Sequence, residues 1–200
     1  MKFGSALITC LALLIAVTGC SNQSATNSST ASHGDHHDDH DHDHDHHGEP
    51  GKIEPPVAPS DEGKKYILSE SPSNPQDVIA AKESAEDTNE VTLVGRIGGS
   101  HDPWIEGRAI FTIVDSSLQS CDKIPGDSCP TPWDYCCRTD KLPTASALVK
   151  VVDENGEPIQ SDARDLLGVR ELTEVVVQGK AKRDEGGNLT VLASGIYVKK

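Results

Sequence analysis

The 200-residue sequence contains two clusters of side chains that can bind metal ions. Eight of its nine His residues lie in one tract, residues 33–47, where they are interleaved with Asp. They are His33, His36, His37, His40, His42, His44, His46 and His47. Imidazole nitrogen binds Zn²⁺, Cu²⁺ and Ni²⁺, and neighbouring carboxylates can accept the free ring N–H. The tract is predicted to bind several such ions with moderate affinity, and to release them below about pH 6.5 as His becomes protonated.

The tract resembles the His/Asp-rich loops of zinc-uptake binding proteins and of ZIP-type transporters. The resemblance is one of composition and covers residues 33–47. It implies that the segment collects metal, either as a buffer or as a donor to a partner such as an envelope metal transporter. The alternative is a solvated spacer whose affinity for metal has no function.

The second cluster lies in a long predicted loop, residues 116–143. It contains four cysteines, Cys121, Cys129, Cys136 and Cys137. In an oxidising compartment four cysteines predict two disulfides. Because adjacent cysteines bridge poorly, the disulfides are expected to join the first two cysteines to the last two. The spacing does not determine which of the first two pairs with which of the last two. The alternative is a soft-metal site in which two or three thiolates and His101 bind Zn²⁺ or Cu⁺. A thiol-redox pair is a third interpretation.

The first twenty residues have the pattern of an export signal. A lysine precedes an apolar run over residues 6–17, and residues 17–20 read Val-Thr-Gly-Cys. This pattern resembles the signal peptide and lipobox of bacterial lipoproteins. The resemblance implies removal of residues 1–19, acylation of Cys20 and a lipid anchor in the membrane. Ser21 implies sorting to the outer membrane, on its periplasmic side, in a cell that has one.

The rest of the chain predicts a tether followed by a mainly β domain. Residues 20–63 are rich in polar residues and Pro, which predicts a disordered tether. Residues 64–89 are predicted to form a short strand and then a helix from Pro75 to Ala85. Within residues 90–200, five segments are apolar and β-branched in a pattern typical of strands. These segments are 91–97, 109–115, 145–152, 174–181 and 189–198, with a helical turn expected at 162–168.

Five strands with a short helix between the third and the fourth predict an OB-fold-like barrel. Gly95, Gly179 and Gly195 are expected at the bends that close it. The segment resembles small exported OB-fold proteins of bacteria, a likeness of fold that assigns no function. A β-sandwich is the alternative, although it usually needs about seven strands.

Charge and missing motifs exclude several classes of function. The formal net charge is −14, from 32 acidic and 18 basic residues, which excludes a nucleic-acid partner because phosphate binding needs a basic surface. The chain has no GxSxG, HExxH or phosphate-loop motif, so neither an enzyme nor an organic cofactor is predicted. The predicted function is metal binding at the cell envelope through the His-rich arm. The alternative is a structural or protein-interaction module on which the tract is only a spacer.

Overall fold

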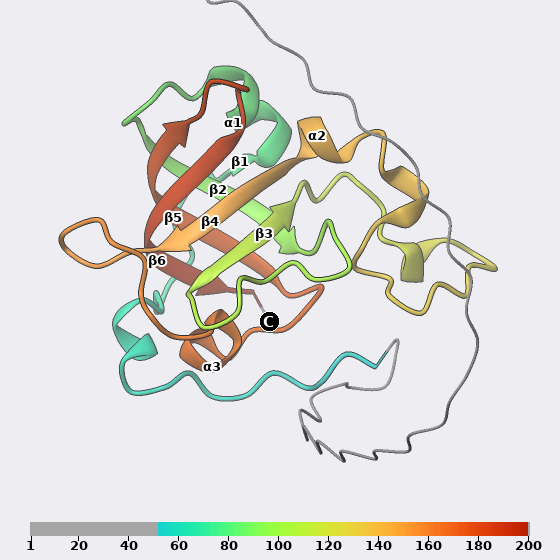
Figure 1. Cartoon of the computed structure of the whole chain (residues 1–200), viewed down its shortest axis with the longest axis horizontal. Helices are drawn as coiled ribbons and strands as arrows, with labels where there is room; N and C mark the ends of the chain where they lie inside the picture. Colours follow the sequence, from blue (N-terminus) through green and yellow to red (C-terminus); the bar gives the residue numbers. More distant parts are fainter. Residues whose placement is uncertain (1–51, 200) are drawn as a thin grey trace, which may run out of the picture. The chain divides into compact units, whose positions relative to one another are not determined.

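The computed structural model describes residues 52–199, in which a barrel of β-strands is the main feature (Figure 1). The strands are β1 (Gln76–Asp77), β2 (Glu90–Ile97), β3 (Ile110–Val114), β4 (Ser146–Val151), β5 (Glu174–Arg183) and β6 (Leu189–Val198). Neighbouring strands follow the order β2-β3-β4-β6-β5, and β5 pairs again with β2, which closes the ring. The β4–β6 pair is parallel, and the other pairs in the ring are antiparallel. The predicted five-stranded, OB-fold-like barrel is confirmed.

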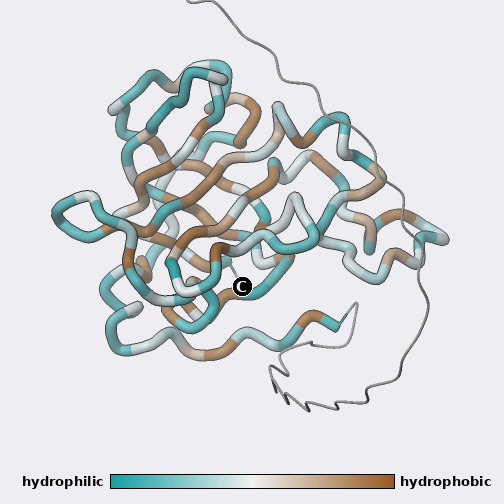
Figure 2. Tube along the Cα trace, viewed as in Figure 1, coloured by the Kyte–Doolittle hydropathy of each residue, from teal (hydrophilic) through white to brown (hydrophobic). Residues whose placement is uncertain are grey.

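Alternating burial explains why these segments form strands. In β2 every second side chain from Val91 to Ile97 is buried, and β6 repeats this pattern from Leu189 to Ala193. Apolar residues follow the strands in Figure 2, and their buried members form a single core around Phe111. The period of two therefore places one face of each strand inside the barrel. The five predicted strands agree with β2–β6 to within two residues at each end.

The strands β5 and β6 come unusually close together at Gly179. The pairing of β5 with β6 shifts register between Gln178 and Gly179, and a side chain at Gly179 would place its Cβ 2.1 Å from the carbonyl oxygen of Leu192. That approach is far inside van der Waals contact, so only glycine fits without a backbone shift. The Cβ positions at Gly95 and Gly195 are also crowded, with nearest atoms at 3.0 and 2.8 Å. These glycines were predicted at bends of the barrel, and of the three only Gly179 lies at a register shift between paired strands.

Short helices accompany the barrel. The α-helices are α1 (Val78–Ser84), α2 (Leu142–Ala145) and α3 (Ala163–Leu167), and the 3₁₀ helices are Gly63–Lys65, Cys121–Lys123 and Cys136–Arg138. α1 and α3 lie at opposite ends of the barrel in Figure 1, and each buries apolar side chains in the core. The helical turn predicted between the third and fourth strands is α3. None of the helices within residues 52–199 is long and apolar enough to cross a membrane.

The start of α1 differs from the prediction. The helix was expected from Pro75, but it begins at Val78. Gln76 and Asp77 instead form β1, which pairs in parallel with Leu93 and Val94 of β2. Gln76 and Asp77 therefore pair with a barrel strand, although the local helix signals predict them in the first turn of the helix.

The described end of the predicted tether is attached to the barrel at α3. Val57 N–H donates to the carbonyl of Gly168 (3.2 Å), and Ser60 N–H donates to the carbonyl of Leu166 (3.1 Å). Gly168 ends α3 with φ 72°, and a Cβ there would lie 2.1 Å from the carbonyl oxygen of Val57. Order was expected only from about residue 64. Glu54 also lies 3.7 Å from the guanidinium of Arg170, so contact with the rest of the domain already begins at Glu54.

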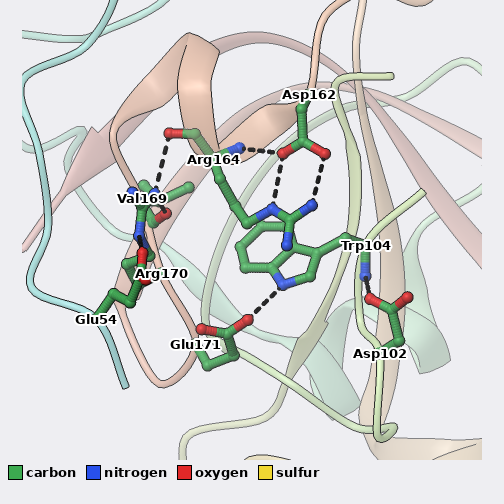
Figure 3. A network of polar contacts seen from close by, with 8 residues as sticks. All are labelled: Glu54, Asp102, Trp104, Asp162, Arg164, Val169, Arg170 and Glu171. Carbon is green, nitrogen blue, oxygen red and sulfur yellow. Dashed lines mark hydrogen bonds and ion pairs between the residues drawn. The ribbon is translucent and has the colours of Figure 1, made fainter. Parts of the chain in front are cut away.

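A polar network fixes α3 against the loop that follows β2 (Figure 3). Asp162 caps α3 by accepting from the Arg164 N–H, and its carboxylate also accepts two hydrogen bonds from the Arg164 guanidinium, at 2.9 and 2.8 Å. That guanidinium lies 5.7 Å from the ring centroid of Trp104, whose indole N–H donates to Glu171. Burial alone would raise the pKa of Asp162, but the bonds from Arg164 outweigh it and lower that pKa.

We expect Asp162→Ala to lower the free energy of unfolding by about 1–2 kcal/mol, the usual cost of losing an N-cap residue. Asp162→Asn keeps the cap and should cost less. Because the folded-state pKa is depressed, the advantage of Asp162 over Asn is complete above about pH 4 and is lost as the pH falls through the folded value. Urea unfolding of the three proteins at several pH values measures both effects. An Asn variant as unstable as the Ala variant near neutral pH would contradict the capping role.

Candidate metal centre

The predicted lipidation site and the His tract lie outside the described residues. Cys20 and all eight His of residues 33–47 precede residue 52. Their roles stay predictions, and the structure bears on the second cluster, in the loop between β3 and β4.

This loop projects from one side of the barrel (yellow to gold in Figure 1) and is fastened to it by its backbone. Trp133 accepts a hydrogen bond from Gly99 N–H through its carbonyl (2.8 Å) and donates its indole N–H to the carbonyl of His101 (3.0 Å). Tyr135 is fully buried and adopts a left-handed backbone conformation, φ 57°. Cys121 N–H donates to the carbonyl of Pro132 (3.1 Å). These contacts bring Cys121 back to the segment that carries the last two cysteines.

All four cysteines are free thiols in the structure, and their sulfur atoms converge. Cys136 Sγ lies 3.6 Å from Cys121 Sγ, 3.5 Å from Cys129 Sγ and 3.9 Å from Cys137 Sγ. Two carboxylates join them. Asp134 Oδ1 lies 3.8 Å from Cys129 Sγ, and Asp127 Oδ2 lies 3.4 Å from Cys137 Sγ.

These donors form two groups that can each hold a metal ion. The first group is Cys121, Cys129, Asp134 and Cys136, and the second is Cys121, Asp127 and Cys137. Within each group all donor atoms lie within 4.8 Å of one another. The sequence predicted a soft-metal site as one of three interpretations of these cysteines, and the structure shows a Cys/Asp cluster with the composition such a site requires.

The spacing between donors fits tetrahedral coordination. Zn–S bonds of about 2.3 Å and Zn–O bonds of about 2.1 Å place two sulfurs about 3.8 Å apart, and a sulfur and an oxygen about 3.6 Å apart. Within the first group the S···S separations are 3.5 and 3.6 Å and the S···O separation is 3.8 Å, and within the second group the S···O separation is 3.4 Å. They differ from the tetrahedral values by at most about 0.3 Å. A disulfide needs about 2.0 Å, so forming one requires the sulfur atoms to move closer together.

The two carboxylates are held in place by the loop itself. Asp134 accepts from the N–H of Cys136 through Oδ1 (2.8 Å) and from the hydroxyl of Thr131 through Oδ2 (2.7 Å). Asp127 accepts from the N–H of Cys129 through Oδ1 (2.8 Å), and its Oδ2 lies next to the sulfur of Cys137. Hydrogen bonds of this kind orient a ligand before metal binds, as the partners of metal-ligating side chains do.

The apo cluster favours protonated thiols. Interactions with the Cys129 and Cys121 thiols raise the pKa of Cys136 well above its usual value, and the Asp127 carboxylate raises the pKa of Cys137. Crowded sulfurs and carboxylates repel further negative charge, so a bound cation is what would stabilise the thiolates. A metal ion would therefore displace protons from this cluster as it binds.

His101 is not part of the cluster. It is exposed, and neither ligand group found within residues 52–199 includes it. The aspartates, in contrast, were not predicted as ligands. They occur in two copies of an Asp-x-Cys pattern, Asp127-Ser-Cys129 and Asp134-Tyr-Cys136. In each copy the Asp side chain accepts from the N–H of the Cys two residues later, and this repeat is the signal that would have identified them.

Comparison with known proteins does not assign this site, since no protein-family model and no curated protein matches the chain.

Proposed function

We propose that the protein is an envelope-anchored lipoprotein that binds transition-metal ions, and that it buffers them or donates them to a partner. One observation carries the proposal: three thiols and a carboxylate lie within 4.8 Å of one another, spaced as the ligands of one ion are. The His tract supplies a second set of donors in the same chain. The anchor is Cys20 of the predicted lipobox, which would place both sets of donors at the membrane.

Zn²⁺ is the ion that both donor sets can bind in the same oxidation state. Thiolates select Zn²⁺ and Cu⁺, whereas imidazoles bind Zn²⁺, Cu²⁺ and Ni²⁺. Copper would have to change its oxidation state between the two sites, and zinc has no redox chemistry. The tract is expected to bind ions weakly and the Cys/Asp cluster to bind them more tightly. The cluster is preorganised, whereas a tract that is disordered, as its sequence predicts, must lose conformational freedom on binding.

Calorimetric titration of the reduced protein with Zn²⁺ near neutral pH tests the proposal. Deletion of residues 33–47 is expected to remove the weaker sites and leave tight binding. The double substitution Cys129→Ser/Cys136→Ser is expected to remove the tight binding and leave the weak sites. The matched control is Ser128→Ala, an exposed position beside Cys129 and outside both ligand groups.

Two other results would overturn the role of the cluster. Loss of all binding on deletion of the tract would leave the barrel without a metal site. Resistance of all four cysteines in the exported protein to alkylation, after denaturation with a chelator but before reduction, would show two disulfides. Either result would favour the alternative, a protein-interaction module.

A further inference from the structure

The two ligand groups of the cluster share one residue, Cys121. This residue is 1% exposed and lies in the 3₁₀ helix Cys121–Lys123, with Cys129, Asp134 and Cys136 in one group and Asp127 and Cys137 in the other. A thiolate sulfur has three lone pairs and can bind two closed-shell metal ions at once. The position of Cys121 is therefore that of a bridging ligand.

The number of donors also exceeds what one ion uses. A zinc ion in a closed site takes four ligands, and the first group supplies four. Asp127 and Cys137 would then be left over, with their donor atoms 3.4 Å apart and within 4.8 Å of Cys121 Sγ. With all six ligands ionised the cluster carries six negative charges, so one divalent ion leaves four uncompensated and two ions leave two. Unlike-charge attraction at these distances favours the second ion.

We propose that the Cys loop binds two divalent ions of the Zn²⁺ class, bridged by the thiolate of Cys121. This inference rests on the proposed metal-binding function and specifies its site. The first ion is held by Cys121, Cys129, Asp134 and Cys136. The second is held by Cys121, Asp127 and Cys137. The four thiols lose their protons to solvent, so binding of two Zn²⁺ to the reduced loop releases four H⁺, and the carboxylates contribute none.

The two ions differ in their ligand count. The first has four protein ligands, which is the closed set of a structural site, and two of them, Cys129 and Asp134, are half-buried. The second has three protein ligands and keeps a fourth position for water or for a ligand from outside the loop. Each ion has one exposed thiol ligand, Cys136 for the first and Cys137 for the second, so the open position is what distinguishes the second ion. The second ion is therefore the one that exchanges, and an imidazole is the kind of donor that can deliver it or remove it.

Cadmium NMR of the reduced, full-length protein tests the bridge directly. With ¹¹³Cd²⁺, we expect two resonances shifted by thiolate coordination, distinct from ions bound by imidazole and carboxylate. In a ¹H–¹¹³Cd correlation, the β-protons of Cys121 should couple to both cadmium ions, those of Cys129 and Cys136 to one, and those of Cys137 to the other. This readout needs no substitution, so it does not depend on a variant that folds.

Other patterns separate failure of the bridge from failure of the function. One thiolate-shifted resonance, or two with Cys121 coupled to only one, overturns the bridge and keeps metal binding in the loop. If no thiolate-shifted resonance is seen, both the bridge and metal binding in the loop are overturned.

Asp127→Asn should lower the affinity for the second ion only, by about 100-fold if the ligands contribute equally to that affinity. The matched control is Asp122→Asn, which changes a neighbouring carboxylate that pairs with Ser120 and Lys123 and belongs to neither group. Equal effects of the two substitutions would also overturn the assignment of Asp127.

Discussion

Zn²⁺ is expected to raise the midpoint of thermal unfolding of the reduced protein by about 10 °C, and Cys136→Ser is expected to remove most of that increase. A ligand at 1,000 times its Kd stabilises the folded state by about 4 kcal/mol, and each kcal/mol moves the midpoint by about 3 °C in a domain of this size. Zn²⁺ is expected to favour the folded state because the donors at positions 121–137 are brought together in the folded loop, which is hydrogen-bonded to the barrel. The predicted His tract would bind ions whether or not the barrel is folded, so it adds little to the shift.

Loss of Cys136 should weaken the ion of the four-ligand group, because Cys136 is one of its ligands and its sulfur lies close to the other three. It is within 3.9 Å of the other three sulfurs. Structural zinc sites bind with about 10–16 kcal/mol for four ligands, so one ligand accounts for about 3 kcal/mol, or about 100-fold in affinity. The same Zn²⁺ concentration is then only about 10 times the Kd, and the stabilisation falls to about 1.4 kcal/mol.

Differential scanning calorimetry with and without Zn²⁺ measures both shifts. Ser128→Ala should behave as the unchanged protein does, because Ser128 belongs to neither ligand group. A shift that survives in Cys136→Ser would show that the stabilising ion is bound elsewhere in the chain. No shift in the unchanged, reduced protein would contradict a metal centre in the loop.

Much of the barrel is predictable from local sequence, because a strand with one buried face repeats every two residues. β6 was predicted at residues 189–198 and is observed there, and its burial alternates as expected from Leu189 to Gly195. α1 could not be placed as well. Its first turn competes with pairing between Gln76–Asp77 and Leu93–Val94, a contact between segments far apart in sequence that no local pattern reports.

The candidate site, like the fold, could be predicted only in part from the sequence. The cysteines were identifiable by residue type, and His101 was included only because its loop was expected to lie nearby. Its backbone does contact the Cys loop through Trp133, but neither ligand group includes it. Which donors converge is decided by the path of the loop backbone, including the left-handed Tyr135 and the bond from Cys121 to Pro132. These details depend on tertiary packing, so the aspartate ligands emerge only from the folded loop.

Gly179→Ala is expected to lower the free energy of unfolding by about 3 kcal/mol and the thermal midpoint by about 10 °C. The added Cβ would lie 2.1 Å from the carbonyl oxygen of Leu192 and 2.8 Å from the Cα of Ala193. Both atoms belong to the backbone of β6, so no side-chain rotation relieves the overlap. The two strands must separate at the register shift, which weakens hydrogen bonds on the side of the barrel where β5 and β6 pair.

Gly186→Ala is the matched control, because it adds the same methyl group to the turn between the same two strands. Its nearest neighbours would be side-chain atoms of Asn188 and Asp184 at 3.4 Å, which is ordinary contact for a methyl group. We expect a change in the free energy of unfolding of less than about 0.5 kcal/mol, as for most surface substitutions. Urea unfolding of both variants measures the difference. If Gly179→Ala were as stable as Gly186→Ala, the backbones of β5 and β6 would be able to separate at little cost, and the barrel would not require glycine at position 179.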